Sequence, residues 1–358
     1  MPDTPKKILV INLGSSSTKA AYYEDENCLF KENLSHPAEE LKEFPALWDQ
    51  EGYRLAKVED FLTRHGLKVA ELDAVVTRGG HTRPLDGGVY RINEVMMAES
   101  RSEKFGVHAC DLGMRIAEAF SAQGPVPLTA YPPVTDEFEP LARYSGLPEM
   151  PRRSSFHALN HKGVARQYAK DAGRPYEDLN LIVVHMGGGI SVSPHKRGRM
   201  VDANNAILGD GPFCTNRTGT LPSGPLIDAC FSGDYTRESL RRRLNGNGGM
   251  MAFVGESDTL TVEKRAAAGD EKCSEVLDAM AYQTAKEIGG AAAVLKGRVN
   301  AIVLTGGMAN SKRLTEAIVE RVGFIAPVHL YPGEFEMESL ALSALEVLRG
   351  QREALALK

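Results

Sequence analysis

The sequence predicts an α/β fold built from two duplicated domains, and three observations support this. Short β-branched segments alternate with longer segments of helical periodicity along most of the chain. The opening pattern of apolar run, small-residue turn and second apolar run recurs about half a chain later. The chain has 358 residues, of which 42% are hydrophobic, so it can build two sizeable cores.

The first half begins with a strand, a turn and a second strand. Residues 8–12 (ILVIN) and 20–25 (AAYYED) are the strands, and Gly14-Ser15-Ser16-Ser17 lies in the turn between them. A helical pattern over 47–66 ends at Gly66, a residue that commonly stops helices. Further predicted elements are strands over 72–80 and 88–94 and a helix over 106–124.

The second half repeats this design after a helix over 152–173. It has a strand, glycine turn and strand over 180–198, a long helix over 274–297, a strand over 299–307 and a C-terminal helix over 338–357. No linker rich in serine or proline separates the halves, so we place the boundary near Pro151. The first domain is residues 1–150, with the helix 339–358 packing back on it, and the second domain is residues 151–338.

Composition limits the partners of this chain. The net charge of −5 and pI near 6.0 argue against nucleic acid as a main partner. The N-terminus is not a signal peptide, and no apolar run reaches the roughly 18 residues that a membrane helix requires. Five scattered cysteines without a CxxC pair indicate a reducing environment, so we expect a cytoplasmic protein.

Three strand ends open into small residues that can hold phosphate. These turns contain Gly14-Ser15-Ser16-Ser17, Gly187-Gly188-Gly189 and Gly306-Gly307. Glycine lets backbone N–H groups converge on an anion, although a plain hairpin turn would explain one such case equally well. The first turn is neither a Walker loop nor a Rossmann fingerprint, because no helix follows it. A strand–turn–strand phosphate loop in each of two duplicated domains is typical of the actin-like and sugar-kinase-like superfamily.

Several long motifs make the resemblance specific. They are ILVINLGSSSTK (8–19), VTRGGHTRPLDGGVYRINE (76–94), RRSSFHALNHKGVARQYA (152–169), HMGGGISVSPHKRGRMVDANNAILGDGPF (185–213) and YPGEFEMESLALSALEVLRG (331–350). From about Ile8 to about Gly350, the chain resembles the butyrate kinase branch of the acetate kinase family. The resemblance implies two ribonuclease-H-like (actin-like ATPase) domains with an interdomain cleft. It also implies reversible, ATP- and Mg²⁺-dependent phosphorylation of a short-chain carboxylate (butyrate or a branched relative) to an acyl phosphate, by a homodimer or higher homo-oligomer.

The resemblance implies three catalytic residues. Arg78 would meet the substrate carboxylate or the transferring phosphoryl group, Arg217 would stabilise the transition state, and His157 would lie beside the transferring group. The alternatives are ordinary loop arginines and a core histidine. His161, one helical turn after His157, lacks the glutamate of an HExxH metal motif, so we interpret it as a packing residue or as support for His157.

The same resemblance implies residues for the nucleotide and the metal ion. Asn12 and Glu336 match Mg²⁺ positions, although Glu334 and Glu338 flank Glu336 and leave its register open. Lys19 matches a lysine near the nucleotide phosphates, and a solvated strand lysine is its alternative. The residues expected to bind nucleotide are Gly14, Ser15, Ser17, Lys19, Gly187, Gly188, Gly189, Gly306, Gly307 and, on the adenine side, Asp258.

Two positions depart from the family pattern. Tyr131 stands where relatives usually carry an aspartate that orients or deprotonates the carboxylate, and Leu260 stands where they carry an arginine that touches the nucleotide. These departures motivate a second hypothesis, a nucleotide-binding relative with lost or altered catalysis. A kinase of another small metabolite on the same fold is a third.

Overall fold

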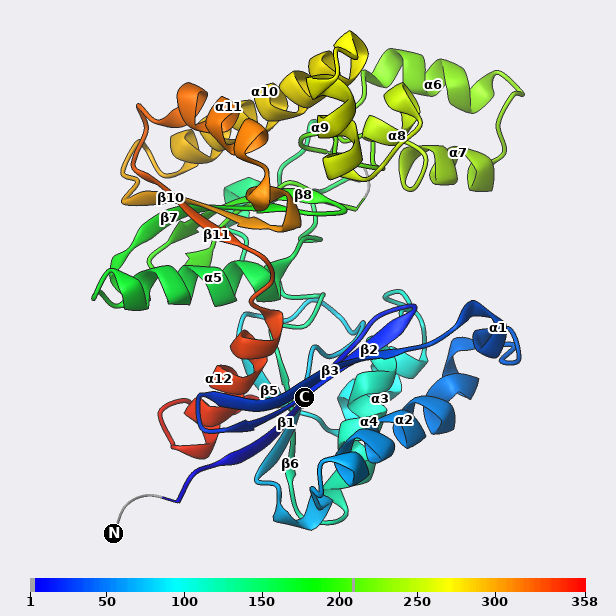
Figure 1. Cartoon of the computed structure of the whole chain (residues 1–358), viewed down its shortest axis with the longest axis vertical. Helices are drawn as coiled ribbons and strands as arrows, with labels where there is room; N and C mark the ends of the chain where they lie inside the picture. Colours follow the sequence, from blue (N-terminus) through cyan, green and yellow to red (C-terminus); the bar gives the residue numbers. More distant parts are fainter. Residues whose placement is uncertain (1–3, 208–209) are drawn as a thin grey trace. The chain divides into compact units, whose positions relative to one another are not determined.

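The computed structural model describes residues 4–207 and 210–358, and the chain divides into two compact units (Figure 1). Unit 1 runs to Asp136 and is completed by Phe335–Lys358, and unit 2 is Glu137–Glu334. The first junction lies before the expected boundary near Pro151. The segment after Asp136 joins unit 2 because Glu137 accepts a hydrogen bond from the Met200 amide at 2.6 Å.

Unit 1 is built on a six-stranded sheet in the order β3-β2-β1-β4-β6-β5. Its strands are β1 (Lys7–Leu13), β2 (Ser17–Glu24), β3 (Asn27–Ser35), β4 (Ala74–Thr77), β5 (Val89–Arg91) and β6 (Val126–Ala130). The first three strands pair antiparallel through tight turns, whereas β1, β4 and β6 are parallel. The carboxyl ends of these three parallel strands therefore meet at one edge of the sheet.

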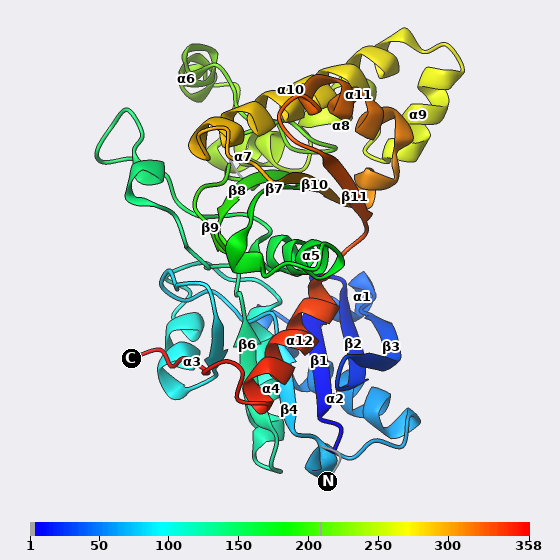
Figure 2. The same ribbon diagram turned by 90° about the vertical axis from the view of Figure 1, so that its left-hand side faces the viewer.

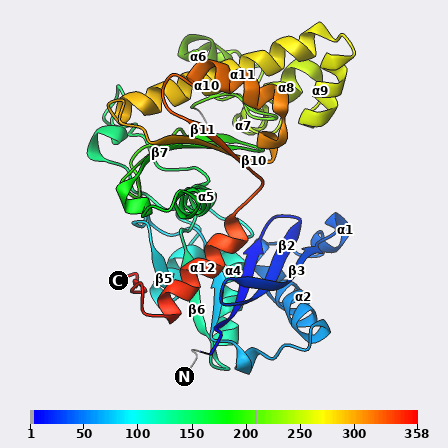
Figure 3. The same cartoon turned by 60° about the vertical axis from the view of Figure 1, so that its left-hand side comes forward.

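Helices cover both faces of this sheet. They are α1 (Ala38–Leu41), α2 (Glu51–Arg64), α3 (Glu94–Arg101), α4 (Asp111–Ser121) and α12 (Glu336–Leu348), with short 3-10 turns η1 (Leu47–Gln50) and η2 (Val69–Glu71). Helices α2 and α4 lie on one face and α12 on the other (Figure 3). Residues spaced as on one helix face, including Met337, Leu340 and Ala344, bury α12 against the strands.

The expected C-terminal helix is wrong beyond Leu348. Gly350 adopts a positive φ of 68°, a conformation that ends helices. The chain then runs beside β5, where the Leu355 amide donates to the Val89 carbonyl and the Arg91 amide donates to the Leu355 carbonyl, both at 2.8 Å.

Unit 2 repeats the sheet topology of unit 1. Its strands are β7 (Asn180–Met186), β8 (Ile190–Lys196), β9 (Arg199–Met200), β10 (Ala301–Gly306) and β11 (Val328–Pro332), in the order β11-β10-β7-β8-β9. Strands β7, β8 and β9 pair antiparallel, and β7, β10 and β11 are parallel, as in β1–β3 and β1, β4 and β6. The expected duplication of an α/β unit is therefore present, and unit 1 adds β5 at one edge.

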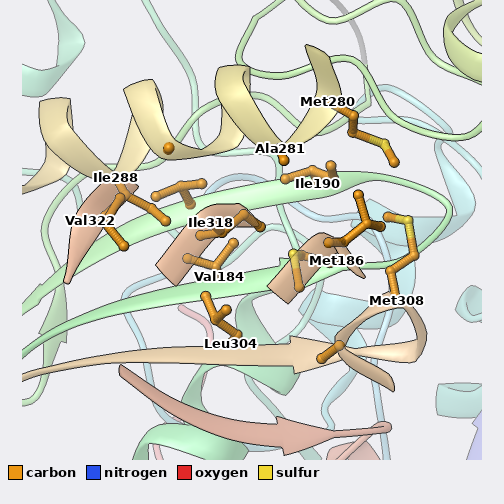
Figure 4. Packing of buried hydrophobic residues seen from close by; sticks show 14 of the residues in the cluster. Val184, Met186, Ile190, Met280, Ala281, Ile288, Leu304, Met308, Ile318 and Val322 are labelled. Carbon is orange, nitrogen blue, oxygen red and sulfur yellow. The ribbon is translucent and has the colours of Figure 1, made fainter. Parts of the chain in front are cut away.

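The core of unit 2 lies between its sheet and two helices. Figure 2 shows α5 on one face and α10 with α11 on the other. Val184 and Leu304 from the strands pack against Ile288 of α10 and Ile318 of α11 (Figure 4). The helices are α5 (Ala158–Asp171), α6 (Ser223–Phe231), α7 (Arg237–Leu244), α8 (Gly249–Val254), α9 (Thr259–Ala267), α10 (Glu271–Val294) and α11 (Lys312–Val322), with 3-10 turns η3 (Pro140–Arg143), η4 (Tyr176–Asp178) and η5 (Gly307–Asn310). Over the described residues, no helix combines the length and the apolarity needed to cross a membrane.

Candidate active site

The carboxyl edge of the unit 1 sheet gathers three residues singled out from the sequence. Asn12 lies at the end of β1, Arg78 directly follows β4 and Tyr131 directly follows β6. Ligands of open α/β sheets bind at this kind of edge. The edge is therefore the candidate site of unit 1.

Asn12, Arg78 and Glu336 come together there. The Asn12 amide nitrogen donates to Glu336 Oε2 at 2.6 Å, and Arg78 NH1 lies 3.9 Å from the same oxygen. Glu336 is buried and is the first residue of α12, where the helix dipole stabilises a carboxylate. Of the three neighbouring glutamates, Glu336 is the one that contacts Asn12. Glu338 instead pairs with Lys31 at 3.2 Å, and Glu334 is exposed.

These donors fit a magnesium ion. A buried carboxylate beside an amide side chain supplies oxygen atoms, which Mg²⁺ prefers, and Mg²⁺ usually takes few protein ligands because it keeps several waters. The Arg78 guanidinium beside Glu336 balances part of the negative charge of the carboxylate, whose oxygen atoms are still metal ligands. Asn12 and Glu336 are therefore the residues that would hold the ion.

The serine turn between β1 and β2 is fixed by a buried arginine. Arg54 of α2 donates from NH1 to the Gly14 carbonyl at 2.9 Å and from NH2 to the Ser15 carbonyl at 3.1 Å. The His36 amide donates to the Ser16 carbonyl at 2.8 Å. Because donors elsewhere in unit 1 hold these carbonyl oxygens, the turn keeps one conformation. Sequence reasoning missed Arg54.

Lys19 and His108 also lie beside this turn. Lys19 is paired with Asn12 in the β1–β2 ladder, so the two side chains share a face of the sheet. His108 Nε2 lies 3.3 Å from the Ser15 hydroxyl. Burial, together with the nearby charge of Arg78, lowers the pKa of His108, so this ring is neutral at pH 7. His108 is a further site residue that the sequence analysis missed.

The turn after Arg78 requires glycine at both positions. Gly79 has a φ of 77°, and a Cβ there would lie 2.2 Å from Thr129 Oγ1. At Gly80, a Cβ would lie 2.3 Å from an Asp111 oxygen. Close packing against β6 and α4 thus sets the direction in which the chain leaves Arg78.

Tyr131 is buried and has an unusual backbone conformation. Its φ is 45°, in the left-handed region that aromatic residues rarely adopt. Its hydroxyl lies 3.4 Å from Arg352 NH1, and Arg352 also pairs with Glu346. The phenol is therefore engaged with the segment that follows α12, and a strained backbone holds it at the site edge.

The carboxyl edge of the unit 2 sheet brings two glycine turns together. Gly187–Gly189 follows β7, and Gly306 and Gly307 lie at the end of the neighbouring parallel strand β10. Gly306 has a φ of 90°, and a Cβ there would lie 2.4 Å from the Met186 carbonyl oxygen. Gly306 thus packs closely against Met186, the residue directly before the first turn.

Arg217 lies against the first of these turns. A Cβ at Gly189 would be 2.3 Å from Arg217 NH1, so glycine leaves room for the guanidinium. Arg217 donates from NH1 to the Ala206 carbonyl at 2.6 Å and from Nε to Asn245 Oδ1 at 3.0 Å. These bonds orient the Arg217 guanidinium beside the turn. The turn itself is held by Cys214, whose thiol donates to the Gly188 carbonyl at 3.2 Å.

His157 meets a second histidine that sequence reasoning missed. The rings of His157 and His185 stack with centroids 4.0 Å apart. The Asn160 amide lies 2.8 Å from His185 Nδ1, and the position of a Cβ on Gly187 would be 2.8 Å from His185 Nε2. His185 therefore reaches the glycine turn. Its place two residues before Gly187, on a buried strand, was the signal that could have identified it.

Asp258 and Leu260 lie at the start of α9, apart from these contacts. Asp258 caps the helix, because its carboxylate accepts from the Thr261 amide at 3.0 Å and from the Thr261 hydroxyl at 2.6 Å. Leu260, in the first turn of the helix, is exposed. Asp258 therefore has a structural partner in unit 2, and its role toward adenine stays a prediction.

Comparison with known proteins identifies the family. Residues 148–328 match the Acetokinase family. Butyrate kinase 2 of Clostridium acetobutylicum is 46% identical over 355 residues, which covers 97% of this chain and 98% of that protein. The expected resemblance is confirmed by this match.

Solved structures confirm the fold class. The crystal structure of Porphyromonas gingivalis acetate kinase has a TM-score of 0.79 at 19% identity, covering 97% of this chain and 100% of that chain. A propionate kinase from Francisella tularensis has a TM-score of 0.72 at 18% identity, covering 94% and 98%. At such low identity these two structures support the fold alone. The sequence identity over nearly the full length shows that this chain belongs to the acetokinase family.

Proposed function

We propose that the protein catalyses the reversible, ATP-dependent phosphorylation of a short-chain carboxylate, butyrate or a branched relative, to an acyl phosphate. The meeting of Asn12, Arg78 and Glu336 beside the Gly14–Ser17 turn carries this proposal. A cation, a carboxylate and a turn of the kind that binds phosphate therefore lie at one edge of the unit 1 sheet. The relative in Clostridium acetobutylicum, a butyrate kinase, supports the choice of substrate.

In this proposal, unit 1 binds the acid and the metal ion. The planar guanidinium of Arg78 binds the substrate carboxylate or the phosphoryl group with two parallel hydrogen bonds. Asn12 and Glu336 would hold Mg²⁺, which neutralises phosphate charge when bound. The Ser15 and Ser16 amides, the Ser15 and Ser17 hydroxyls and Lys19 bind phosphate oxygens. The Gly14 amide closes the turn by donating to the Ser17 carbonyl at 2.8 Å.

Unit 2 supplies donors for the nucleotide and the transferring group. The amides of Gly188 and Gly189 bind phosphate oxygens, whereas the Gly187 amide closes the turn by donating to the Gly189 carbonyl at 3.1 Å. Gly306 and Gly307 approach the adenosine, and Asp258 binds on the adenine side. Arg217 and His157 donate to the phosphoryl oxygens, on which negative charge is spread in the transition state. A carboxylate substrate is already ionised near pH 7 and needs no general base. Tyr131 in place of an aspartate is therefore compatible with catalysis.

The direct test is a coupled assay with acetate, propionate, butyrate and isobutyrate in millimolar ATP and Mg²⁺, with acyl phosphate trapped as the hydroxamate. We expect kcat/KM for a four-carbon acid to exceed that for acetate by about tenfold or more, since each methylene contributes about 1–3 kcal/mol. Calorimetric binding of ATP without turnover of any acid would instead support the nucleotide-binding relative with lost catalysis.

The metal assignment has its own test. Glu336→Gln should lower kcat/KM by about 100-fold and raise the Mg²⁺ concentration needed for half-maximal rate, because it removes a ligand charge. Glu338→Gln is a matched control, since Glu338 lies two positions after Glu336 in the same helix and pairs with Lys31. Equal effects of the two substitutions would contradict the assignment.

We also propose a cytoplasmic homodimer or higher homo-oligomer. All five cysteines are free thiols, which suits a reducing compartment. Four large apolar residues within one short segment of unit 2 are exposed, namely Leu141, Tyr144, Leu147 and Met150. Apolar residues gathered in this way are typical of protein interfaces. We call them the apolar segment.

A further inference from the structure

A chain of hydrogen-bonding side chains runs from His157 into the interior of unit 2. His157 Nδ1 lies 2.9 Å from the Ser191 hydroxyl, and His161 Nε2 lies 2.8 Å from the same oxygen. His161 Nδ1 then lies 3.4 Å from His195 Nε2, and His195 Nδ1 lies 2.7 Å from the Tyr176 hydroxyl. We call these five residues the histidine chain.

Secondary structure places the members of the histidine chain in line. His157 and His161 are one helical turn apart at the start of α5, so they share a helix face. Ser191 and His195 are four residues apart on β8, so they share a sheet face. Apart from His157, which is half-buried, every member is almost fully buried. Each polar atom must therefore be satisfied inside the protein.

The two inner histidines are neutral. Burial lowers the pKa of both His161 and His195 well below the ordinary value. Neighbouring positive charge lowers both further, from His185 for His161 and from His161 and Lys162 for His195. The Lys162 ammonium lies 5.4 Å from the centre of the Tyr176 ring and pairs with Glu137 at 2.9 Å, so a cation already lies beside the inner end of the chain. A neutral imidazole has one donor and one acceptor nitrogen.

This restriction couples all the protons in the histidine chain. Ser191 has one hydroxyl proton, so it can donate to His157 or to His161 but not to both. If Ser191 donates to His157, His161 donates to Ser191, His195 donates to His161 and Tyr176 donates to His195. If Ser191 donates to His161, every bond reverses. Two opposite orders therefore satisfy the chain, and they place the His157 proton on different nitrogens.

The chemistry at Tyr176 favours the first order. The Tyr176 hydroxyl lies 2.7 Å from His195 Nδ1. A phenol O–H, with an ordinary pKa of about 10, is a much stronger donor than the N–H of a neutral imidazole, and an imidazole nitrogen is a stronger acceptor than a phenol oxygen. In this order His157 Nδ1 accepts from Ser191, so the proton of the neutral His157 ring is on Nε2.

We infer that Ser191, His161, His195 and Tyr176 are positioning residues that hold His157 as the tautomer protonated on Nε2. His157 can then donate a hydrogen bond to a phosphoryl oxygen without carrying a charge; this role rests on the proposed function. The opposite tautomer would present a lone pair to the anion and repel it.

The test compares two serines of β8. Ser191→Ala removes the link between His157 and His161, and Ser193→Ala is its matched control. Ser193 is equally buried on the same face, but its hydroxyl donates to the Asp202 carbonyl. Two-bond ¹H–¹⁵N spectra of protein labelled with ¹⁵N-histidine report the tautomer, and the His157→Gln variant assigns the His157 signals.

We expect His157 to be protonated on Nε2 in the wild type and to be a mixture of tautomers in Ser191→Ala. In that variant kcat should fall roughly tenfold, as for one lost hydrogen bond, and the KM for ATP should be unchanged. Ser193→Ala should keep the wild-type spectrum and kcat, and Ser191→Thr should restore both. Tyr176→Phe should act like Ser191→Ala from the far end of the chain. Tyr331→Phe, whose hydroxyl bonds Asp171 at 2.7 Å, is its control.

A wild-type His157 protonated on Nδ1 would overturn the inference, and so would identical His157 spectra for Ser191→Ala and Ser193→Ala. A changed tautomer with unchanged kcat would remove the positioning role. If the spectra behave as expected but no acyl phosphate forms with any acid, the proposed function fails and the tautomer assignment stands.

Discussion

At the scale of single residues, Arg54 shows how a buried charge can hold a binding turn. Its guanidinium donates to two consecutive carbonyl groups of the serine turn and, through Nε, to Gln50 at 3.0 Å. Peptide planes are rigid, so fixing the carbonyl groups of Gly14 and Ser15 also fixes the amide N–H groups that follow them. Arg54 thereby sets the direction of the amides that would meet phosphate.

Replacing Arg54 by methionine should therefore weaken nucleotide use. We expect Arg54→Met to lower kcat/KM for ATP by about 10- to 100-fold, because the Gly14 and Ser15 carbonyl groups lose the charged donor that fixes the turn. Arg64→Met is the control on the same helix, since Arg64 is exposed and pairs with Glu32. Steady-state kinetics that give the same loss for both variants would contradict this role.

His36 is a buried residue that makes unit 1 sensitive to acid. Its Nε2 lies 2.8 Å from the Thr18 hydroxyl, and burial lowers its pKa from 6.5 to about 4, with smaller contributions from Arg54 and Lys57. Between pH 6.5 and pH 4 the unfolded state therefore binds a proton that the folded state does not. The stability from this group is complete above pH 6.5 and is lost as the pH falls toward 4.

The corresponding prediction is measurable with one fluorophore. Trp48, the single tryptophan, lies in unit 1 as His36 does, so its fluorescence in urea reports the unfolding of this unit. When the pH is lowered from 7.5 to 5.5, the unfolding free energy of the wild type should fall by about 1.3 kcal/mol more than that of His36→Gln. His329 in unit 2 is exposed, and the unfolding free energy of the control variant His329→Gln should fall by as much as that of the wild type. Identical losses in His36→Gln and the wild type would rule out this contribution.

These residues also show what the sequence could predict about the site. The grouping of Asn12, Arg78 and Glu336 follows from strand ends and family motifs, and the structure brings these three side chains together. The contact of Glu336 with Asn12 could not be distinguished from sequence, because it depends on where α12 begins: Glu336 is its first residue, Glu338 lies two positions along it and Glu334 precedes it. Arg54 gave no signal, since its partners lie about 40 residues away in sequence.

At the scale of elements, α12 completes the unit to which the start of the chain belongs. It packs on β1, β4 and β6 with one apolar face and presents Glu336 at its first position. The element that supplies the carboxylate is thus held by hydrophobic burial along its whole length. A loss of this packing would disturb the carboxylate as well as the stability of unit 1.

Truncation of the buried Leu340 tests this link. Leu340→Ala should lower the unfolding free energy of unit 1 by about 2–5 kcal/mol, measured through Trp48 fluorescence, and should also raise the Mg²⁺ requirement. Leu342→Ala is the control on the partly exposed face of the same helix, where the loss should be smaller. If unit 1 unfolds at the same urea concentration in both variants, α12 is not anchored by this face.

Four of the elements that sequence reasoning missed have an identifiable physical cause. Strand β3 is largely exposed and polar, so it lacks a hydrophobic signal. Strands β6 and β11 contain Pro127 and Pro332, which are unusual in strands, and α6 contains Gly224 and Pro225, which are poor helix formers. The strands at the centre of each sheet were predictable because both of their faces are buried.

At the scale of the whole molecule, duplication explains why phosphate-type turns occur in both units. Each sheet opens with an antiparallel pair whose connecting turn lies at the carboxyl edge of the parallel strands. Both units therefore carry a small-residue turn at the same topological position. This correspondence was visible in the sequence as a weak repeat.

The apolar segment predicts the behaviour of the protein in solution. Light scattering should give at least twice the chain mass of 38.9 kDa, and the double variant Leu141→Asp/Tyr144→Asp should reduce it to one chain, because charges are costly at an apolar interface. Phe324→Asp is the control at an equally exposed apolar residue of unit 2. A mass that stays unchanged in the double variant would place the interface elsewhere.

The contact between Asn12 and Glu336 joins residues near opposite ends of the chain, 324 positions apart. On the ribosome, all of unit 2 is synthesised before Glu336 is added. A nascent polypeptide therefore carries Asn12, one of the two proposed metal ligands, throughout the synthesis of unit 2 without the glutamate. Phosphotransfer that depends on this pair begins only after Glu336 has been added and α12 has packed on the sheet.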